Sequence, residues 1–376
     1  MRDGDLETII VDAAHMPDSV GWADRLAVSL TPSLIRTLAA RDTLTGSAFQ
    51  EEARAVADNL KRRAAFTPTP PTSSRLPAHY HRIPAPVRHA IAHGIGRLQR
   101  SRQAHWAHFP GWPLDLSADF AADLAQERRP AFAPTPVLLS HDIDTPEGLR
   151  NLVAMFLPVE EAVGARSSNY IVPCAWPVDD ALAKEILARG HEIGVHGFNH
   201  ANRTPFCSAK ERRERIDAGR TFGDRYGATG YRAPSLLRTE ALLVDLAGHY
   251  RYDSSLPTAG GAFPVPNNGC ATARPWRLGK IWEIPLTLPR DGSLRFLGHS
   301  PSAIAALWRE TTETIVRSGG IVSLLTHCEA GFSGNEAMLG AYRRFIAWMA
   351  NDSRFVFMRM DALAAQLEAE DATRNG

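Results

Sequence analysis

Beyond residue 130, short apolar runs alternate with longer amphipathic stretches. Residues 136–144 and 321–327 have the length and composition of buried strands, whereas 147–164 and 302–320 repeat apolar positions at helical spacing. Strands that alternate with helices of this length predict a parallel sheet with crossover helices, and therefore an α/β fold. Roughly seven such units favour a closed (β/α) barrel over an open sheet.

The first third of the chain has a different pattern. Apolar residues at helical spacing predict helices over 31–38 and 49–60. Residues 67–86 contain six prolines in twenty positions, and proline cannot donate a backbone hydrogen bond, so this segment predicts an extended connector. We therefore expect a mainly helical extension over 1–130, which includes the connector, and a barrel over 131–376.

A further helix is predicted directly after the connector. Its apolar positions recur at helical spacing: Val87, Ile91, Ile95 and Leu98. Arginines without neighbouring acids surround them: Arg88, Arg97, Arg100 and Arg102. We expect this helix to pack on the main domain through its apolar stripe and to leave a basic face in solvent. The alternative is a helix that binds membrane surfaces or phosphate groups, which would suit a lipid-linked substrate.

The composition, 44% hydrophobic and 22% charged over 376 residues, is that of a soluble globular protein and excludes a disordered or fibrous chain. The 42 Lys and Arg residues balance 41 Asp and Glu residues, so we expect no nucleic-acid partner. The four cysteines form no Cys-x-x-Cys pair, which argues against a disulfide scaffold. Because the N-terminus lacks a signal-peptide pattern and no run of about 18 apolar residues occurs, we expect a cytoplasmic protein.

Ionisable residues gather where the predicted strands end. The segments are His141–Asp144, His196–His200, Arg232–Ser235 and Thr326–His327. In a barrel of this class, the active site lies at the carboxyl ends of the strands. These positions therefore predict a catalytic centre, because a purely structural barrel needs only turns there.

Asp144, His196 and His200 form a plausible metal-binding triad. Two imidazoles and one carboxylate hold a divalent ion and leave coordination positions open for water and substrate. The His-x-x-x-His spacing lets both rings reach one point from a single helical turn or a tight loop. The alternative is that 196–200 is a polar loop and that Asp144 is the N-cap of the following helix.

Asp142 and His327 are candidates for proton transfer. Residues two apart in a strand share a face, so Asp142 and Asp144 point toward the same barrel mouth. Two like charges so close are costly unless a cation or a proton relieves them, which favours one ligand and one general base. His327 is positioned to donate a proton to a leaving group, unless it is structural. We expect packing roles for His141 and His191.

These segments, in this order, resemble the NodB homology domain of the polysaccharide deacetylases, carbohydrate esterase family 4. The matching elements are an Asp-x-Asp motif at 142–144, His-x-x-x-His at 196–200, Arg-x-Pro at 232–234, and a histidine that closes a hydrophobic strand at 327. The resemblance covers roughly residues 131–365. It implies a distorted (β/α)7–8 barrel and a metal-dependent N-deacetylase.

The resemblance also implies residue roles. Asp142 would be the base, Arg232 would hold it in place, and His327 would be the acid. Asp144, His196 and His200 would bind Zn²⁺, although Co²⁺, Ni²⁺ or Fe²⁺ fits the same ligands.

Three departures from the family pattern affect these roles. Ile143 separates aspartates that are usually adjacent, so base and ligand could be exchanged. Ser235 stands where the family has an aromatic residue, but its backbone N–H can still stabilise an oxyanion. The family's Asp-Trp pair is not evident, so Asp253 or Glu283 would supply the carboxylate that orients His327.

The resemblance implies that the substrate is an N-acylated amino sugar, carrying acetyl or formyl, in a glycan or glycoconjugate. The residues expected to line it are Pro234, Asp253, Trp282 and Glu283. Within the same fold, the alternative is a cyclic amide hydrolase of the allantoinase type. The alternative from a different functional class is a catalytically silent carbohydrate-binding protein. The extension allows peripheral membrane contact or a homodimer.

Overall fold

A computed structural model describes the backbone of Thr8–Ile9 and Val28–Ser29, parts of 51–74, and residues 83–101, 110–124, 132–259 and 270–375. The helix predicted over 31–38 and most of the connector 67–86 lie outside these residues. Within the helix predicted over 49–60, residues 57–60 are helical, and the helix continues to 62.

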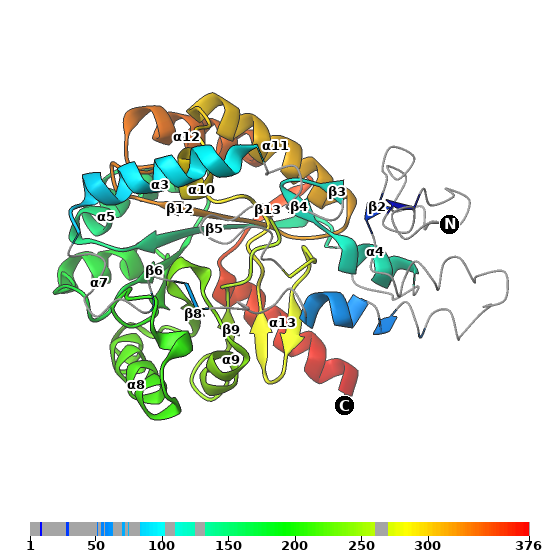
Figure 1. Ribbon diagram of the computed structural model, residues 1–376, viewed down its shortest axis with the longest axis horizontal. Coiled ribbons are helices and arrows are strands. Elements are labelled where there is room, and N and C mark those ends of the chain that lie inside the picture. The colour runs from blue at the N-terminus through cyan, green and yellow to red at the C-terminus, as the bar shows by residue number, and fades with distance from the viewer. Residues whose placement is uncertain are drawn as a thin grey trace.

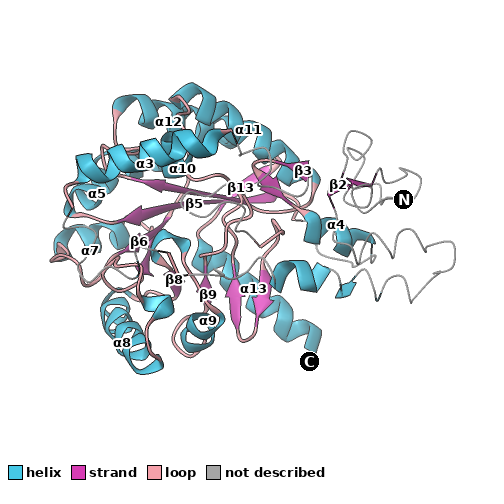
Figure 2. Cartoon of the chain, viewed as in Figure 1, coloured by secondary structure: helices cyan, strands magenta, loops and turns pink. Residues whose placement is uncertain are grey.

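A curled sheet forms the centre of the described chain, with helices on its outside (Figures 1 and 2). Its strands are β5 (Thr135–Ile143), β6 (Ser168–Ile171), β7 (Glu192–His196), β8 (Gly230–Arg232), β9 (Tyr252–Asp253), β10 (Trp276–Leu278), β11 (Ile281–Glu283), β12 (Val322–His327) and β13 (Phe355–Phe357). The order is β10-β11-β9-β8-β7-β6-β5-β12, and β13 pairs with the start of β5. Neighbouring strands are parallel except in the β10–β11 hairpin. The predicted distorted α/β barrel is confirmed.

The chain that follows β11 connects the β9 side of this sheet with β12. Leu286 N–H donates to Leu256 O at 2.9 Å, and Leu288 N–H donates to Ser323 O in β12 at 3.0 Å. Residues 284–288 therefore bridge the strand region after β9 and β12. This bridge closes the barrel without a regular strand at that point.

Apart from the helical residues 57–62, the helices of the described chain mostly follow the predicted spacing. They are α3 (Ala85–Arg100), α4 (Ser117–Leu124), α5 (Pro146–Asn151), α6 (Leu157–Glu161), α7 (Asp180–Ala188), α8 (Ala209–Tyr226), α9 (Glu240–Leu246), α10 (Asp291–Phe296), α11 (Pro301–Arg317), α12 (Glu336–Ala350) and α13 (Met360–Asn375). Small elements complete the list: β1 (Thr8–Ile9), β2 (Val28–Ser29), β3 (Pro110–Gly111), β4 (Leu114–Asp115), and the 3₁₀ turns η9 (Thr204–Phe206) and η10 (Pro234–Leu236). The sequence patterns did not predict α10 or β10.

The helix predicted over 147–164 is interrupted by a π-helical turn, η8 (Leu152–Phe156), between α5 and α6. Pro158 has no N–H for the carbonyl one turn earlier, so the regular hydrogen-bond pattern cannot continue through it. The wider turn lets Leu157 N–H donate to Leu152 O instead. The chain therefore stays helical on both sides of the proline.

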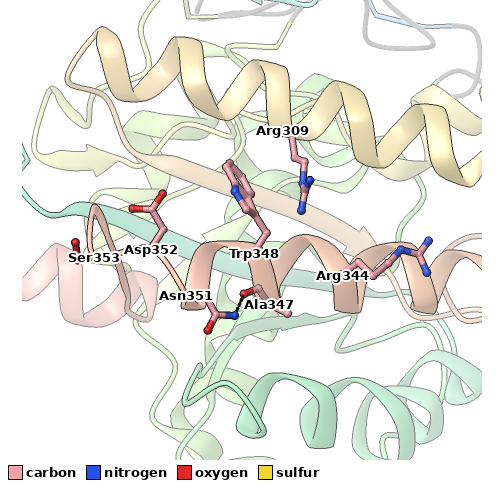
Figure 3. Close-up of a pocket in the computed structure, with 7 residues that line it drawn as sticks. All are labelled: Arg309, Arg344, Ala347, Trp348, Asn351, Asp352 and Ser353. Carbon is pink, nitrogen blue, oxygen red and sulfur yellow. Dashed lines mark hydrogen bonds between the residues drawn. The ribbon is translucent and has the colours of Figure 1, made fainter.

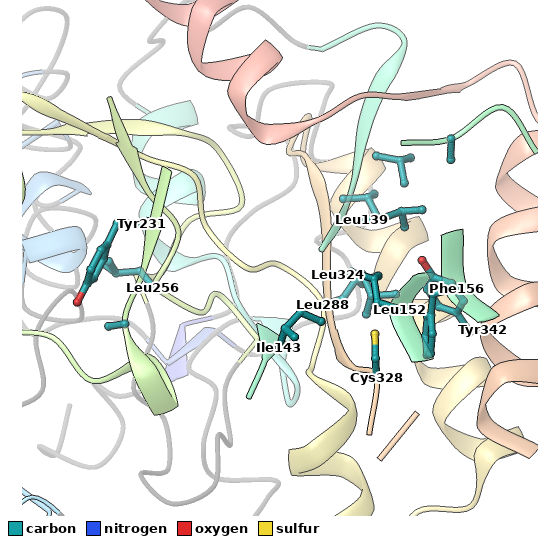
Figure 4. Close-up of a cluster of buried hydrophobic side chains, with 14 of the residues drawn as sticks. Leu139, Ile143, Leu152, Phe156, Tyr231, Leu256, Leu288, Leu324, Cys328 and Tyr342 are labelled. Atoms are coloured by element: carbon teal, nitrogen blue, oxygen red, sulfur yellow. The ribbon is translucent and has the colours of Figure 1, made fainter. Parts of the chain in front are cut away.

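Alternation along β5 separates the two faces of the barrel wall. Leu139 and Ile143 belong to the same buried cluster as Phe156 and Tyr342 of the covering helices (Figure 4), and the ring of His141 lies 5.1 Å from that of Phe156. Leu138 belongs to a second cluster, which includes residues of α13. Because side chains alternate along a strand, the even-numbered positions of β5 point away from the covering helices, toward the barrel interior.

Helix α3 lies along α10 (Figure 1). The prediction that its apolar stripe packs on the main domain is wrong, because these residues are exposed: Val87, Ile91, Ile95 and Leu98. A Cβ on Gly96 would lie 2.1 Å from Phe296 O, so α3 approaches α10 closely at Gly96. Among the described residues, no helix combines the length and the apolar character needed to cross a bilayer.

Candidate active site

The strand register brings the predicted site residues to one level. His327 at the end of β12 pairs with Asp142 in β5, and Arg232 at the end of β8 pairs with His196 at the end of β7. Asp144 follows β5 directly. Parallel strands end at the same rim, so residues from distant parts of the sequence meet at the mouth of the barrel.

Asp144, His196 and His200 converge on one point. Asp144 Oδ1 lies 3.4 Å from His196 Nε2 and 3.3 Å from His200 Nε2, and one ligand atom of each residue lies within 4.8 Å of the others. His196 Nδ1–H donates to Arg232 O at 3.0 Å, which leaves the Nε2 lone pair facing the cluster. Asp144 Oδ1 and His196 Nε2 are buried without a hydrogen-bond partner. Two imidazoles and a carboxylate arranged in this way fit a divalent transition-metal ion.

The loops that carry these residues adopt unusual backbone conformations. His200 and Ser235 have positive φ angles of 59° and 52°. Gly197 also has a positive φ, 64°, and a Cβ there would lie 2.4 Å from Pro234 Cδ, so only glycine fits. Left-handed backbone at non-glycine residues is costly and clusters at functional sites. Pro234 thus packs on the His196–His200 loop.

The backbone of Asp144 forms hydrogen bonds with two residues that the sequence analysis did not predict to be part of the site. Glu329 Oε1 accepts from Asp144 N–H at 3.3 Å and from the Thr145 hydroxyl at 2.8 Å. Trp176 Nε1–H donates to Asp144 O at 2.8 Å. The N-cap of α5 is Thr145, so Asp144 does not have the capping role that was its structural alternative.

Asp142 forms a buried ion pair. Arg232 Nη1 lies 3.0 Å from Asp142 Oδ1, while the rest of the guanidinium donates to the carbonyl and hydroxyl of Ser254 and lies 3.9 Å from the Tyr170 ring centroid. Burial acts to raise the pKa of Asp142. The electrostatic effects of the His196 imidazole and of the Arg232 guanidinium outweigh it, so the pKa is lowered. Asp142 is therefore ionised at neutral pH.

The carboxylate that orients His327 is Asp291, at the start of α10. Asp291 Oδ1 lies 2.8 Å from His327 Nδ1, and Oδ2 accepts from His327 N–H at 2.8 Å and from the Ser333 hydroxyl at 2.7 Å. Burial acts to lower the pKa of His327, but the charge and hydrogen bond of Asp291 raise it to about 10. The prediction that Asp253 or Glu283 orients His327 is therefore wrong.

Asp253, Glu283 and Trp282 do not line the mouth as expected. Asp253 is fully buried and accepts from the Ser255 hydroxyl at 2.8 Å, and Glu283 is fully buried as well. Trp282 is 7% exposed, and the Arg277 guanidinium lies 4.9 Å from the centroid of its indole ring. These side chains pack within the barrel wall, so a sugar cannot stack on Trp282 in this arrangement.

Asp144 differs electrostatically from Asp142. Burial raises its pKa to about 7, and the charge of Asp142 adds to this effect although His327 opposes it. The Asp144 carboxylate therefore lacks enough compensating positive charge, which a cation between Asp144 and the two histidines would supply.

A hollow on the outer surface lies apart from this rim. It is lined by residues of α11 and α12 and of the turn after α12 (Figure 3): Arg309, Arg344, Ala347, Trp348, Asn351, Asp352 and Ser353. The Arg309 guanidinium lies 5.0 Å from the centroid of the Trp348 ring. None of these residues belongs to the cluster at the strand ends, so the hollow is no part of the candidate site.

Comparison with known proteins bears on the fold. No family model and no curated protein sequence matches the chain. A protein assigned as a polysaccharide deacetylase from Mycobacterium smegmatis has a similar structure, with 18% identity, a TM-score of 0.51, and coverage of 65% of this chain and 93% of that one. A PuuE allantoinase structure is similar at 14% identity and the same TM-score, 0.51, with coverage of 64% of this chain and 92% of that one.

At these identities the similarity establishes the fold. The chain has the NodB-type barrel of the polysaccharide deacetylases, as the sequence motifs predicted. The same barrel also occurs in the allantoinase, so the assignment of a reaction depends on the residues at the rim.

Proposed function

We propose that this protein is a metal-dependent hydrolase that removes an N-acyl group from an amino sugar or a glycoconjugate. The observation that carries the proposal is the convergence of Asp144, His196 and His200 beside an ionised carboxylate, Asp142, and a protonated imidazole, His327. Amide hydrolysis needs a polarised acyl group, a base and an acid, and this rim offers candidates for all three.

Asp144, His196 and His200 would hold the ion. When bound, a divalent metal supplies a water molecule of lowered pKa and polarises the acyl oxygen. Zn²⁺ is the default ion for two histidines and one carboxylate, and Co²⁺, Ni²⁺ and Fe²⁺ fit the same donor set. His196 is presented in the required tautomer, because its Nδ1–H is engaged by Arg232 O.

Asp142 would accept a proton from the attacking water. Its ion pair with Arg232 keeps it ionised and fixes its orientation, and the buried Arg232 is itself held by Ser254. The backbone N–H of Ser235, in the loop that packs on Gly197 through Pro234, is the proposed donor to the developing oxyanion. Such a donor contributes about 3 kcal/mol to transition-state stabilisation.

His327 would donate a proton to the departing amine. Its raised pKa keeps the ring protonated at neutral pH, and Asp291 on Nδ1 leaves Nε2 to act as the acid. The side chain is partly exposed at the mouth, so it is accessible to a substrate.

An acylated amino sugar is the proposed substrate class, and acetyl and formyl groups share the same tetrahedral intermediate. The similarity of the fold to an assigned polysaccharide deacetylase supports this class. Hydrolysis of a cyclic amide is the second candidate, since another structure with a TM-score of 0.51 is an allantoinase.

The test is acyl release by the purified full-length protein. The protein is loaded with Zn²⁺, Co²⁺ or Ni²⁺ and offered N-acetyl and N-formyl amino sugars that are free, nucleotide-linked or lipid-linked. The proposal predicts release of acetate or formate that chelation abolishes. Bound metal with ring opening of a cyclic amide and no acyl release would favour the second candidate. Absence of metal binding would favour a silent binding protein.

A further inference from the structure

Helix α3 presents a continuous aliphatic stripe to solvent. Its members and Ile83, two residues before the helix, are between 39% and 77% exposed: Ile83, Val87, Ile91, Ile95 and Leu98. The helical members are spaced three or four residues apart, so they share one side of the helix. These are five of the seven large exposed hydrophobic residues among the described residues. Exposed aliphatic residues concentrated in this way indicate an interaction surface.

The opposite side of α3 is fixed to the barrel. The rings of His89 and Phe332 lie 5.3 Å apart between centroids, and those of His93 and Phe296 lie 5.2 Å apart. Gly96 approaches the backbone of Phe296 so closely that no Cβ fits. The helix therefore cannot roll to bury its stripe against the barrel without losing this close contact.

The charges on α3 favour an anionic partner. The helix contains Arg88, Arg97 and Arg100 and no acidic residue. A second copy of this chain would bring two basic helices together, which like-charge repulsion opposes. A bilayer with anionic lipids offers an apolar interior for the aliphatic side chains and negative headgroups for the arginines.

We propose that α3 is an interfacial helix that binds this protein peripherally to anionic bilayers, with its aliphatic stripe inserted at the boundary between headgroups and acyl chains. The contacts of α3 orient the barrel at that surface. Phe332 packs against His89 on one side and against His327, at 4.8 Å, on the other. Membrane binding would therefore hold the mouth of the candidate site close to the bilayer surface. The inference does not depend on the reaction proposed above.

The experiment is co-sedimentation of the full-length protein with vesicles of phosphatidylcholine alone and of phosphatidylcholine with about 30% phosphatidylglycerol. We expect binding to the anionic vesicles, weakened about tenfold or more in neutral vesicles and at about 0.5 M salt. The double variant Ile91→Gln/Leu98→Gln should bind about tenfold or more weakly, because it removes two inserted aliphatic side chains without changing the charge. Arg97→Gln should lower only the part of vesicle binding that is sensitive to salt.

A matched control separates the stripe from general surface apolarity. Val244 on α9 is 68% exposed, similar to Leu98 at 77%, and Val244→Gln should leave vesicle binding unchanged. All of these variants should keep the thermal unfolding midpoint, since the substituted side chains are exposed.

Two results would overturn the proposal. One is a wild-type protein that does not bind anionic vesicles, or whose binding the stripe variant leaves intact. The other is a wild-type dimer that the stripe variant dissociates, because the stripe would then be a subunit interface. Neither result depends on acyl release from a soluble amino sugar. The membrane-binding proposal and the proposed function can therefore fail independently.

Discussion

Two histidine–carboxylate clusters lie on opposite sides of β5, and they differ in what the ring nitrogens face. Behind the strand, His141 contacts Thr326 Oγ1 at 2.8 Å and Glu160 Oε1 at 2.7 Å, so both its nitrogens have protein partners. At the rim, His196 donates from Nδ1 but directs Nε2 at Asp144 without a hydrogen bond. We call these the rear cluster (His141, Glu160, His191) and the rim cluster (Asp142, Asp144, His196, His200).

The difference shows that the presence of histidines and carboxylates alone does not define a metal-binding site. His191 in the rear cluster accepts from Ser167 N–H at 2.9 Å through Nδ1 and faces Glu161 at 3.2 Å through Nε2, so it too is engaged on both sides. Buried polar groups that bond one another contribute to stability. The rim cluster instead leaves donor atoms directed at a shared point, which is a poor arrangement for stability and a suitable one for binding a cation. Substitutions should therefore separate the two clusters.

The largest expected effect is on turnover at the rim. Asp142→Asn removes the base but keeps the shape of the side chain, so kcat should fall by about 10²- to 10⁴-fold. Steady-state kinetics on any substrate found to release acyl groups measures this effect. Metal content should stay at the wild-type value, because Asp144 and the two histidines are intact. Unchanged turnover would remove Asp142 as the base.

Substitutions in the rear cluster should change the free energy of unfolding and not the turnover. Glu160 is fully buried and accepts from both His141 and Tyr342, at 2.7 Å and 2.6 Å. Glu160→Ala leaves His141 Nε2 and the Tyr342 hydroxyl buried without their hydrogen-bond partner and should lower the free energy of unfolding by about 2–5 kcal/mol. Chemical denaturation gives the value.

Glu185, in α7, provides the control for that variant. Its side chain is 47% exposed and lies 3.1 Å from Arg189 Nη1, so Glu185→Ala should cost about 1 kcal/mol or less. Equal losses in the two variants would contradict the special role of the rear cluster, as would loss of metal from the stable fraction of Glu160→Ala.

Asp291→Asn tests the acid at the rim. Asp291 raises the pKa of His327 to about 10, and the acid must be protonated to act, so wild-type activity should fall only as the pH approaches that value. Without the carboxylate charge, the pKa of His327 drops and the alkaline limb of the pH–rate profile moves to lower pH. At neutral pH, kcat should fall about a hundredfold. An alkaline limb that does not move would mean that His327 is not the titrating acid.

The smallest effect concerns the metal-free protein. Asp144 has an ordinary pKa of 3.8 when unfolded and about 7 when folded, so between these values the folded state holds a proton that the unfolded state has lost. The metal-free protein should therefore lose stability as the pH rises from about 4 to 7, and Asp144→Asn should recover roughly 1–3 kcal/mol at pH 7. Denaturation curves in chelator at both pH values check this. No gain in the variant would contradict the electrostatic difference between the clusters.

The rim cluster was largely predictable because its spacing is local. A spacing of two residues places Asp142 and Asp144 on the same side of the sheet, and a spacing of four residues brings His196 and His200 together. The separation of His141 from Asp142 follows from the same alternation. These features need no knowledge of distant contacts.

The residues that orient His327 and Asp144 were not predictable in the same way. Asp291 reaches His327 from 36 positions away, through the short helix α10 that no apolar periodicity indicated. Trp176 and Glu329 act on the backbone of Asp144 and leave no spacing pattern. The only sequence signal for Glu329 was its place two residues after His327.

The apolar periodicity of α3 predicted the helix but not the side that packs. A periodic stripe usually marks the buried face, as in α11, where Ile304, Trp308 and Ile315 are buried. In α3 the close approach at Gly96 and the histidine–phenylalanine contacts fix the other side instead. Periodicity states that one side is apolar, and only the packing shows what covers it.

Metal stoichiometry tests the central claim most directly. The full-length protein, stripped with chelator and reloaded with Zn²⁺, should retain about one ion per chain after dialysis, measured by mass spectrometry of the metal. His200→Ala should retain far less, while Glu161→Ala should match the wild type. A wild-type chain that retains no ion, or a His200→Ala variant that retains as much as the wild type, would contradict the claim that Asp144, His196 and His200 form one cation site.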